Sequence, residues 1–110
     1  LYVDDLAEAC LFALEKWDPN QEQNHLNKSK SNLCWLNVGS EYEVSIKELA
    51  DLISKIIGFK GKIIWDNEKP DGTPRKKLDT SRINSLGWEA KTNLKKGITK
   101  TIEAYKKERL

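Results

Sequence analysis

The sequence has no methionine, one histidine, two cysteines and three prolines among its 110 residues. Cys10 and Cys34 lie far apart and form no Cys-X-X-Cys pair, so they predict buried free thiols in a reducing compartment rather than a disulfide framework. His25 has no cysteine, histidine or carboxylate cluster near it in the sequence, so it is expected to be an ordinary surface residue. We therefore expect no metal site.

Strong charge and long apolar runs are also lacking. With 19 basic and 17 acidic residues the net charge is +2, which argues against a dedicated nucleic-acid binder. No apolar run approaches the length that spans a bilayer, so no membrane partner is expected. There is no glycine-rich phosphate loop, no zinc spacing and no nucleophile elbow, and the adjacent Asp4 and Asp5 are interpreted as helix caps. We expect no catalytic residue in the chain.

The length allows one domain at most. The chain opens directly on Leu1-Tyr-Val-Asp-Asp5, which has the character of the middle of a fold. We therefore expect residues 1–110 to be the C-terminal domain of a longer protein.

The coarse pattern predicts an α/β lobe with short strands and about four helices. Strands are expected at 1–3, 33–38 and 62–65, where β-branched and aromatic residues gather. Residues 20–32 are polar throughout and are expected to form an exposed, mobile loop.

Each helix has a start or stop signal. The first is expected to begin at a capping box of Asp5 and Glu8 and to end at Asp18-Pro19, with an apolar face that includes Leu6, Ala9, Cys10 and Leu14. The second has Ser45 and Glu48 as a capping box and Gly58 at its end. A short third helix follows a cap at Asp79 or Thr80, and Asn93 caps the last one.

The polar stretch Lys69-Pro-Asp-Gly-Thr-Pro-Arg-Lys-Lys-Leu-Asp79 is the most informative part of the chain. Its prolines restrict the backbone, and three successive cations, Arg75, Lys76 and Lys77, suit an anion with several oxygens, such as a pyrophosphate. A merely solvated loop explains this pattern equally well. Asp71 would accept a hydrogen bond from a sugar hydroxyl or close a local turn, and Lys62 fits an ordinary solvent-facing lysine.

Several motifs together carry a family resemblance. They are Leu1-Tyr-Val-Asp-Asp-Leu-Ala-Glu-Ala9, Asn37-Val-Gly39, Val44-Ser-Ile-Lys-Glu-Leu-Ala50, Gly58-Phe-Lys-Gly61, Leu86-Gly-Trp88 and above all Lys69-Pro-Asp-Gly-Thr-Pro-Arg-Lys76. Nearly the whole chain resembles the C-terminal part of the GDP-L-fucose synthase family of extended short-chain dehydrogenases/reductases. That family epimerises C3 and C5 of GDP-4-keto-6-deoxy-D-mannose and reduces C4 with NADPH, giving GDP-L-fucose.

The resemblance implies a small substrate-binding lobe whose Rossmann domain, NADPH site and catalytic residues lie upstream of Leu1. Cys10, Cys34 and His25 do not match the family's catalytic positions. By motif, Lys76 matches a lysine that contacts the nucleotide diphosphate, Lys62 matches a basic position near the substrate, and Asp71 sits in the same loop. The implied partner is a GDP-sugar, bound by a cytoplasmic homodimer, and the fragment alone is expected to be inactive.

Two other interpretations remain open. One is the corresponding lobe of another nucleotide-sugar epimerase or dehydratase, against which the Asp71-Gly-Thr-Pro-Arg-Lys76 run argues. The other is a non-catalytic module that binds an acidic partner or RNA through Arg75, Lys76 and Lys77, and its binding would weaken steeply with salt.

Overall fold

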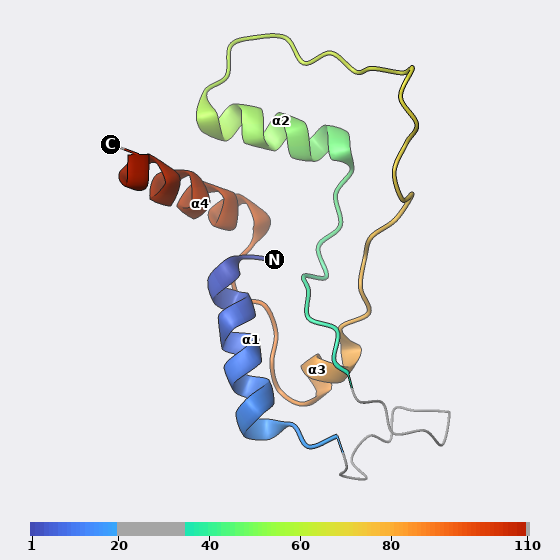
Figure 1. Cartoon of the computed structure of the whole chain (residues 1–110), viewed down its shortest axis with the longest axis vertical. Coiled ribbons are helices and arrows are strands. Elements are labelled where there is room, and N and C mark those ends of the chain that lie inside the picture. Colours follow the sequence, from blue (N-terminus) through green and yellow to red (C-terminus); the bar gives the residue numbers. More distant parts are fainter. Residues whose placement is uncertain (20–34, 110) are drawn as a thin grey trace.

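A computed structural model describes residues 1–19 and 35–109 (Figure 1). The elements in this part of the chain are the helices α1 (Val3–Lys16), α2 (Ile46–Ile57), α3 (Ser81–Ser85) and α4 (Leu94–Arg109). All four predicted helices are confirmed. The expectations for the 20–32 loop, for His25 and for Cys34 lie outside the described residues.

The prediction of short strands is wrong for the described residues, which contain helices and irregular segments but no strand. Leu1 and Tyr2 precede α1, whose first residue is Val3. Residues 35–38 and 62–65 have no ladder partner in this part of the chain, and Ile64 is 78% exposed. A strand exists only where a second backbone segment completes its hydrogen bonds, so the residue preference at 35–38 and 62–65 was not sufficient.

Helix α2 follows its local signals closely. The Ser45 hydroxyl oxygen accepts from the Glu48 amide at 3.1 Å, and the Ser45 amide donates to the Glu48 carboxylate at 2.8 Å. These two bonds complete the predicted capping box. Hydrogen bonds from the Ser45 backbone and side chain also lower the pKa of Glu48. At the other end Gly58 has φ 69° and ψ 30°, the left-handed conformation that glycine adopts without a Cβ penalty.

Helix α1 begins differently from the prediction. Tyr2 is its N-cap residue and makes no side-chain cap bond. Asp5 is 5% exposed and accepts from both the amide and the hydroxyl of Thr92, each at 2.8 Å. Burial raises the pKa of Asp5, but the hydrogen bonds from Thr92 and from the Lys91 backbone, with the charge of Lys100, together outweigh it, so the pKa lies below its usual value. Asp5 therefore joins α1 to the chain just before α4 instead of capping its own helix.

The fully buried core is small and lies between α1 and α3. Its buried members are Ala9, Ile83 and Trp88, and Phe12, Leu36, Val38 and Ala90 pack against them. The inner face of α1 is thus formed by Ala9 and Phe12. Leu6, Cys10 and Leu14, which were predicted to share the apolar face, are exposed, so the prediction of a buried Cys10 thiol is wrong. The periodicity of a helix shows which residues share a face, but it does not show whether another element covers that face.

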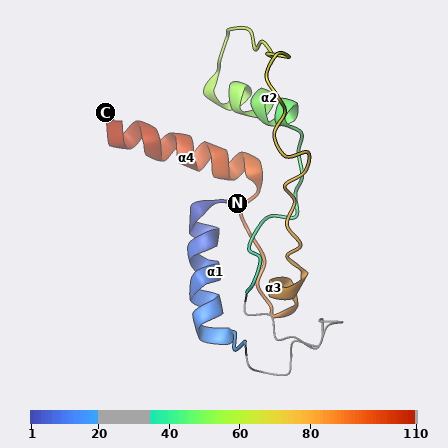
Figure 2. The same cartoon turned by 45° about the vertical axis from the view of Figure 1, so that its right-hand side comes forward.

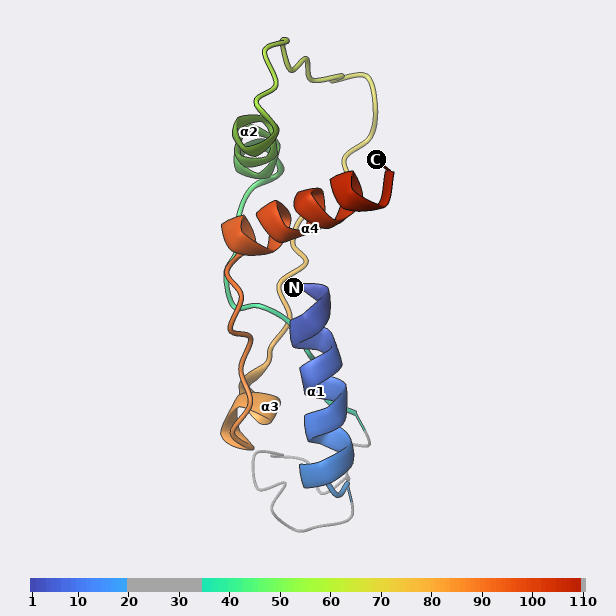
Figure 3. The same cartoon turned by 90° about the vertical axis from the view of Figure 1, so that its left-hand side faces the viewer.

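Helices α2 and α4 pack together in the other half of the molecule (Figures 1 and 3). The Asn93 side chain accepts from the Lys96 amide at 2.9 Å, which confirms the predicted cap of α4. Gly97 lets α4 approach Tyr2, because a Cβ there would lie 3.4 Å from the Tyr2 Cβ. The described chain is open, with a radius of gyration of 18.1 Å, where a compact domain of this length has about 13 Å.

Candidate functional site

The polar stretch 69–79 has no regular structure, and its residues are exposed. Its C-terminal end is fixed at α3. The Asp79 carboxylate accepts from the Ser81 amide at 3.0 Å, and the hydrogen bond with Ser81 lowers the pKa of Asp79. Thr80, the next residue, is only 3% exposed. Thr80 is the N-cap residue of α3 and makes no side-chain cap bond, so the side chain of Asp79 accepts from the first helical amide instead.

A second segment, residues 37–43, lies antiparallel to residues 75–80 (Figure 2). At one end the Asn37 side-chain amide donates to the Asp79 carbonyl at 3.1 Å. In the middle, a Cβ on Gly39 would lie 3.4 Å from Leu78. At the other end Arg75 meets Glu43. Side chains, rather than a ladder of backbone hydrogen bonds, hold these two described segments together.

The pair of Arg75 and Glu43 is bidentate. Nε of Arg75 donates to Oε1 of Glu43 at 2.7 Å, and a terminal nitrogen donates to Oε2 at 2.8 Å. The hydrogen bonds from Arg75 lower the pKa of Glu43 and raise the pKa of Arg75. The charge of Lys77 lowers the pKa of Glu43 further. Arg75 is therefore engaged within the chain, and Lys76 has no ion-pair partner among the described residues.

A groove of about 1140 Å³ opens beside this pair. Residues 72–77 and Tyr42 to Ser45 line part of it. The rest is lined mainly by apolar side chains of α2 and α4, namely Ile46, Leu49, Ile53, Ile57, Leu94, Ile98 and Ile102. Lys76 and Lys77 thus sit at the edge of a largely apolar groove. A concave apolar surface with a few charged groups at one side is the usual form of a site for a small organic anion.

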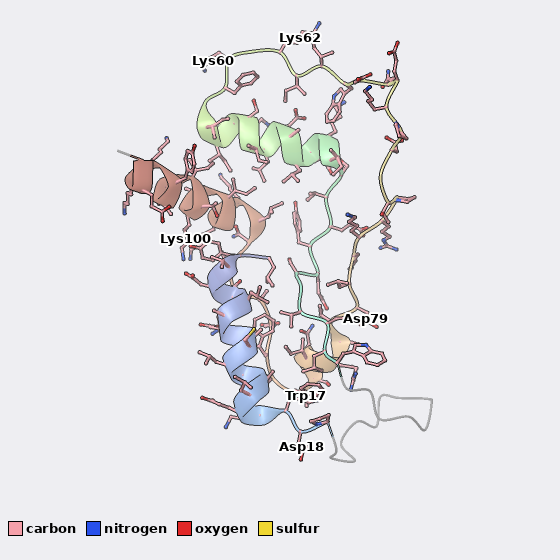
Figure 4. The ribbon with its side chains drawn as sticks, viewed as in Figure 1. Trp17, Asp18, Lys60, Lys62, Asp79 and Lys100 are labelled. Carbon is pink, nitrogen blue, oxygen red and sulfur yellow. The ribbon has the colours of Figure 1, made fainter. Side chains whose placement is uncertain are left out.

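The three residues singled out in the sequence are not all brought together. Lys76 lines the groove, whereas Asp71 and Lys62 do not. Lys62 lies beyond the end of α2, on the outer connection that leads to the 69–79 stretch (Figure 4). Asp71 directly precedes the first loop residue that lines the groove, Gly72.

Sequence reasoning missed Glu43 and used Asn37 only as part of a family motif. Glu43 is 32 positions from Arg75, and Asn37 is 42 positions from Asp79. No local pattern marks either pairing. The only usable signal was the Asn37-Val-Gly39 motif, which places a side-chain amide and a residue without Cβ in one short segment.

The described part of the chain contains no group of three or more histidine, cysteine or carboxylate residues able to hold a metal ion. The Rossmann fingerprint for a nicotinamide dinucleotide is a Gly-X-Gly-X-X-Gly turn between a strand and a helix. None of the six glycines forms such a turn. The residues of this chain therefore do not fit a Rossmann-type site for that cofactor. No helix within 1–19 or 35–109 is long and apolar enough to cross a membrane.

Comparison with solved structures shows what the chain resembles. The chain superposes on a GDP-6-OMe-4-keto-L-xylo-heptose reductase from C. jejuni with a TM-score of 0.81 and 34% identity, over 96% of this chain and 29% of the other. It also superposes on MlghC, a GDP-mannoheptose C4 reductase from Campylobacter jejuni with NADP bound, with a TM-score of 0.72 and 33% identity, over 94% of this chain and 29% of the other. Both of these neighbours are reductases of GDP-linked sugars.

Comparison with known sequences points to one enzyme among these GDP-sugar proteins. GDP-L-fucose synthase 1 from Arabidopsis thaliana is 45% identical over 107 residues, which are 97% of this chain and 29% of that protein. The predicted resemblance to the GDP-L-fucose synthases is therefore confirmed over almost the whole chain. The chain spans less than a third of the length of these relatives. No protein-family model matches it.

Proposed function

We propose that residues 1–110 form the C-terminal substrate-binding domain of a GDP-L-fucose synthase. The whole protein would epimerise C3 and C5 of GDP-4-keto-6-deoxy-D-mannose and reduce C4 with NADPH. The observation that carries the proposal is the 45% identity to GDP-L-fucose synthase 1 over 107 residues of this chain. The groove that residues 72–77 help to line gives the proposed substrate a place to bind. By the resemblance, the catalytic residues and the NADPH site would lie in the part of the protein outside this chain.

Within this domain the proposed task is to hold the nucleotide end of the substrate. Lys76 would contact the diphosphate from the edge of the groove, where a flexible ammonium can follow phosphate oxygens. Asp71 would accept a hydrogen bond from a sugar or ribose hydroxyl, and Lys62 would add a second positive charge. Contacts to the diphosphate fix the sugar ring for chemistry at C3, C4 and C5 elsewhere in the protein.

The test follows NADPH oxidation by the full-length protein that contains this chain, with GDP-4-keto-6-deoxy-D-mannose as substrate. Lys76→Ala is expected to raise KM by about ten- to a hundredfold with kcat little changed, because one charge-assisted hydrogen bond to the substrate is lost. Lys106→Ala is the matched control, since Lys106 is an exposed lysine of α4 outside the groove, and its KM should stay unchanged.

The same assay separates the proposal from its rivals. Competitive inhibition by GDP, but not by UDP, at fixed salt supports the proposal. A protein that is inactive with this substrate but turns over a UDP-sugar would be another nucleotide-sugar epimerase or dehydratase. If the chain were a nucleic-acid-binding module, the protein would bind RNA, and the affinity would fall steeply as the salt concentration rises.

From the resemblance alone we also propose that the full-length protein is a cytoplasmic homodimer. Light scattering of the full-length protein would test the oligomeric state, and a monomeric mass would contradict the proposal.

A further inference from the structure

Three successive cations stand at the edge of the groove, and only one is bound by a fork of hydrogen bonds. Arg75 uses two guanidinium nitrogens to hold both oxygens of Glu43, at 2.7 and 2.8 Å. Both side chains are exposed, at 68% and 43% of their surface, and an exposed ion pair adds little to stability. A bidentate fork nevertheless fixes orientation, because the two planar groups meet in one geometry.

The Arg75–Glu43 pair lies where a fixed orientation affects the groove. Glu43 lies two residues before Ser45, the N-cap of α2, and α2 forms one wall of the groove. Arg75 directly precedes Lys76. The fork therefore connects the start of the α2 wall to the backbone next to the lysine at the groove.

The neighbouring lysines fit this arrangement. Arg75, Lys76 and Lys77 all line the groove, and the charge of Lys77 also acts on Glu43. Lys76 directly follows the residue that the fork holds, and in the described part of the chain it makes no ion pair of its own.

We propose that Arg75 and Glu43 are positioning residues that direct Lys76 toward the substrate diphosphate, and that Arg75 is not itself a phosphate ligand. This inference rests on the proposed function. Holding the backbone at residue 75 lowers the ordering cost when the substrate binds, because Lys76 then has only its own side chain to fix. The Asn37 bond to the Asp79 carbonyl holds the other end of the same segment.

The alternative is that Arg75 is itself a phosphate ligand and that Glu43 only pairs with Arg75 while no substrate is bound. The two cases predict opposite effects of Glu43→Gln. A positioning pair loses its fork, so GDP should bind more weakly. If Arg75 is a phosphate ligand, the loss of the Glu43 charge frees Arg75, so GDP should bind equally well or more tightly.

The experiment measures the Kd for GDP and the KM and kcat for the GDP-sugar in the full-length protein. Glu43→Gln and Arg75→Lys should each raise the Kd for GDP by about three- to tenfold, the size of coupling among residues in one network, with kcat unchanged. Exchange of the two charges, in the double variant Glu43→Arg with Arg75→Glu, should restore part of the affinity. Glu8→Gln is the matched control, because it breaks the exposed Glu8–Lys91 pair, 3.0 Å long, away from the groove.

A double-mutant cycle shows whether the pair acts through Lys76. In the Lys76→Ala background Glu43→Gln should cause no further loss of GDP affinity, whereas independent effects would multiply and would overturn the proposal. Tighter binding by Glu43→Gln would overturn it as well. If the parent protein fails to bind GDP, the proposed function itself fails; if Lys76→Ala weakens binding but Glu43→Gln does not, only the positioning inference fails.

Discussion

Replacement of Ile83 by alanine tests whether the small core between α1 and α3 holds this part of the chain together. Ile83 is fully buried, and its neighbours in the core are Ala9 and Trp88. The change removes three carbon atoms, worth about 2.4 kcal/mol at about 0.8 kcal/mol for each. A cavity that relaxes only in part adds to this cost, so we expect a loss of about 3 kcal/mol in the free energy of unfolding.

Two further variants calibrate that magnitude. Ile83→Val removes a single carbon and should cost about 1 kcal/mol. Ile64→Ala makes the same chemical change as Ile83→Ala at a residue that is 78% exposed, and it should stay within about 0.5 kcal/mol of the parent. The contrast between the two alanine variants therefore isolates burial from side-chain chemistry.

The assay is urea unfolding of the 110-residue chain, followed by far-UV circular dichroism and by tryptophan fluorescence. Trp88 is only 6% exposed and should report the loss of the core directly. A loss of about 3 kcal/mol is a large fraction of the stability of a small domain, so the midpoint should move clearly. If Ile83→Ala and Ile64→Ala lowered stability equally, Ile83 would not be part of a core in solution.

Two other predictions concern single positions. Gly58→Ala should lower the free energy of unfolding by about 1 kcal/mol, because alanine is strained at φ 69°. Gly72→Ala should leave it unchanged, since the φ of Gly72 is not positive and no atom lies within 4 Å of a new Cβ. Equal shifts of the melting temperature in the two variants would contradict this reasoning. Because the pKa of Asp5 is lowered in the folded chain, its stabilising contribution should be complete above about pH 4 and should disappear as the pH falls through the folded-state pKa. Thermal unfolding of the parent and of Asp5→Asn between pH 7 and pH 3 should then converge at the acid end, and a constant gap would argue against the Thr92 contact.

The helices were predictable because their signals are local. The capping box of Ser45 and Glu48, Gly58 at the end of α2 and the Asn93 cap all act within a few residues, and each is found in the structure. Strands at 35–38 and 62–65 were wrongly predicted because a strand depends on a partner that the residue pattern cannot supply.

The candidate site was predictable only in part, for a similar reason. The charge and rigidity of the 69–79 stretch mark it in the sequence, and Lys76 indeed borders the groove. Its partners come from far away, as with Glu43 for Arg75 and Asn37 for Asp79, which are 32 and 42 positions apart. The exposure of Cys10 was missed because helical periodicity does not reveal what covers a face.

The side-chain pairing of 37–43 with 75–80 has a consequence for hydrogen exchange. Backbone amides in a sheet exchange slowly because each donates to a neighbouring strand, but no such ladder joins these two segments. Amides near Arg75 should therefore exchange with deuterium rapidly even while the guanidinium fork keeps the segment in place. A fixed conformation and slow amide exchange are therefore separate properties of this segment. A ligand that covers residues 75–79 would slow the exchange of their amides while the backbone conformation hardly changed.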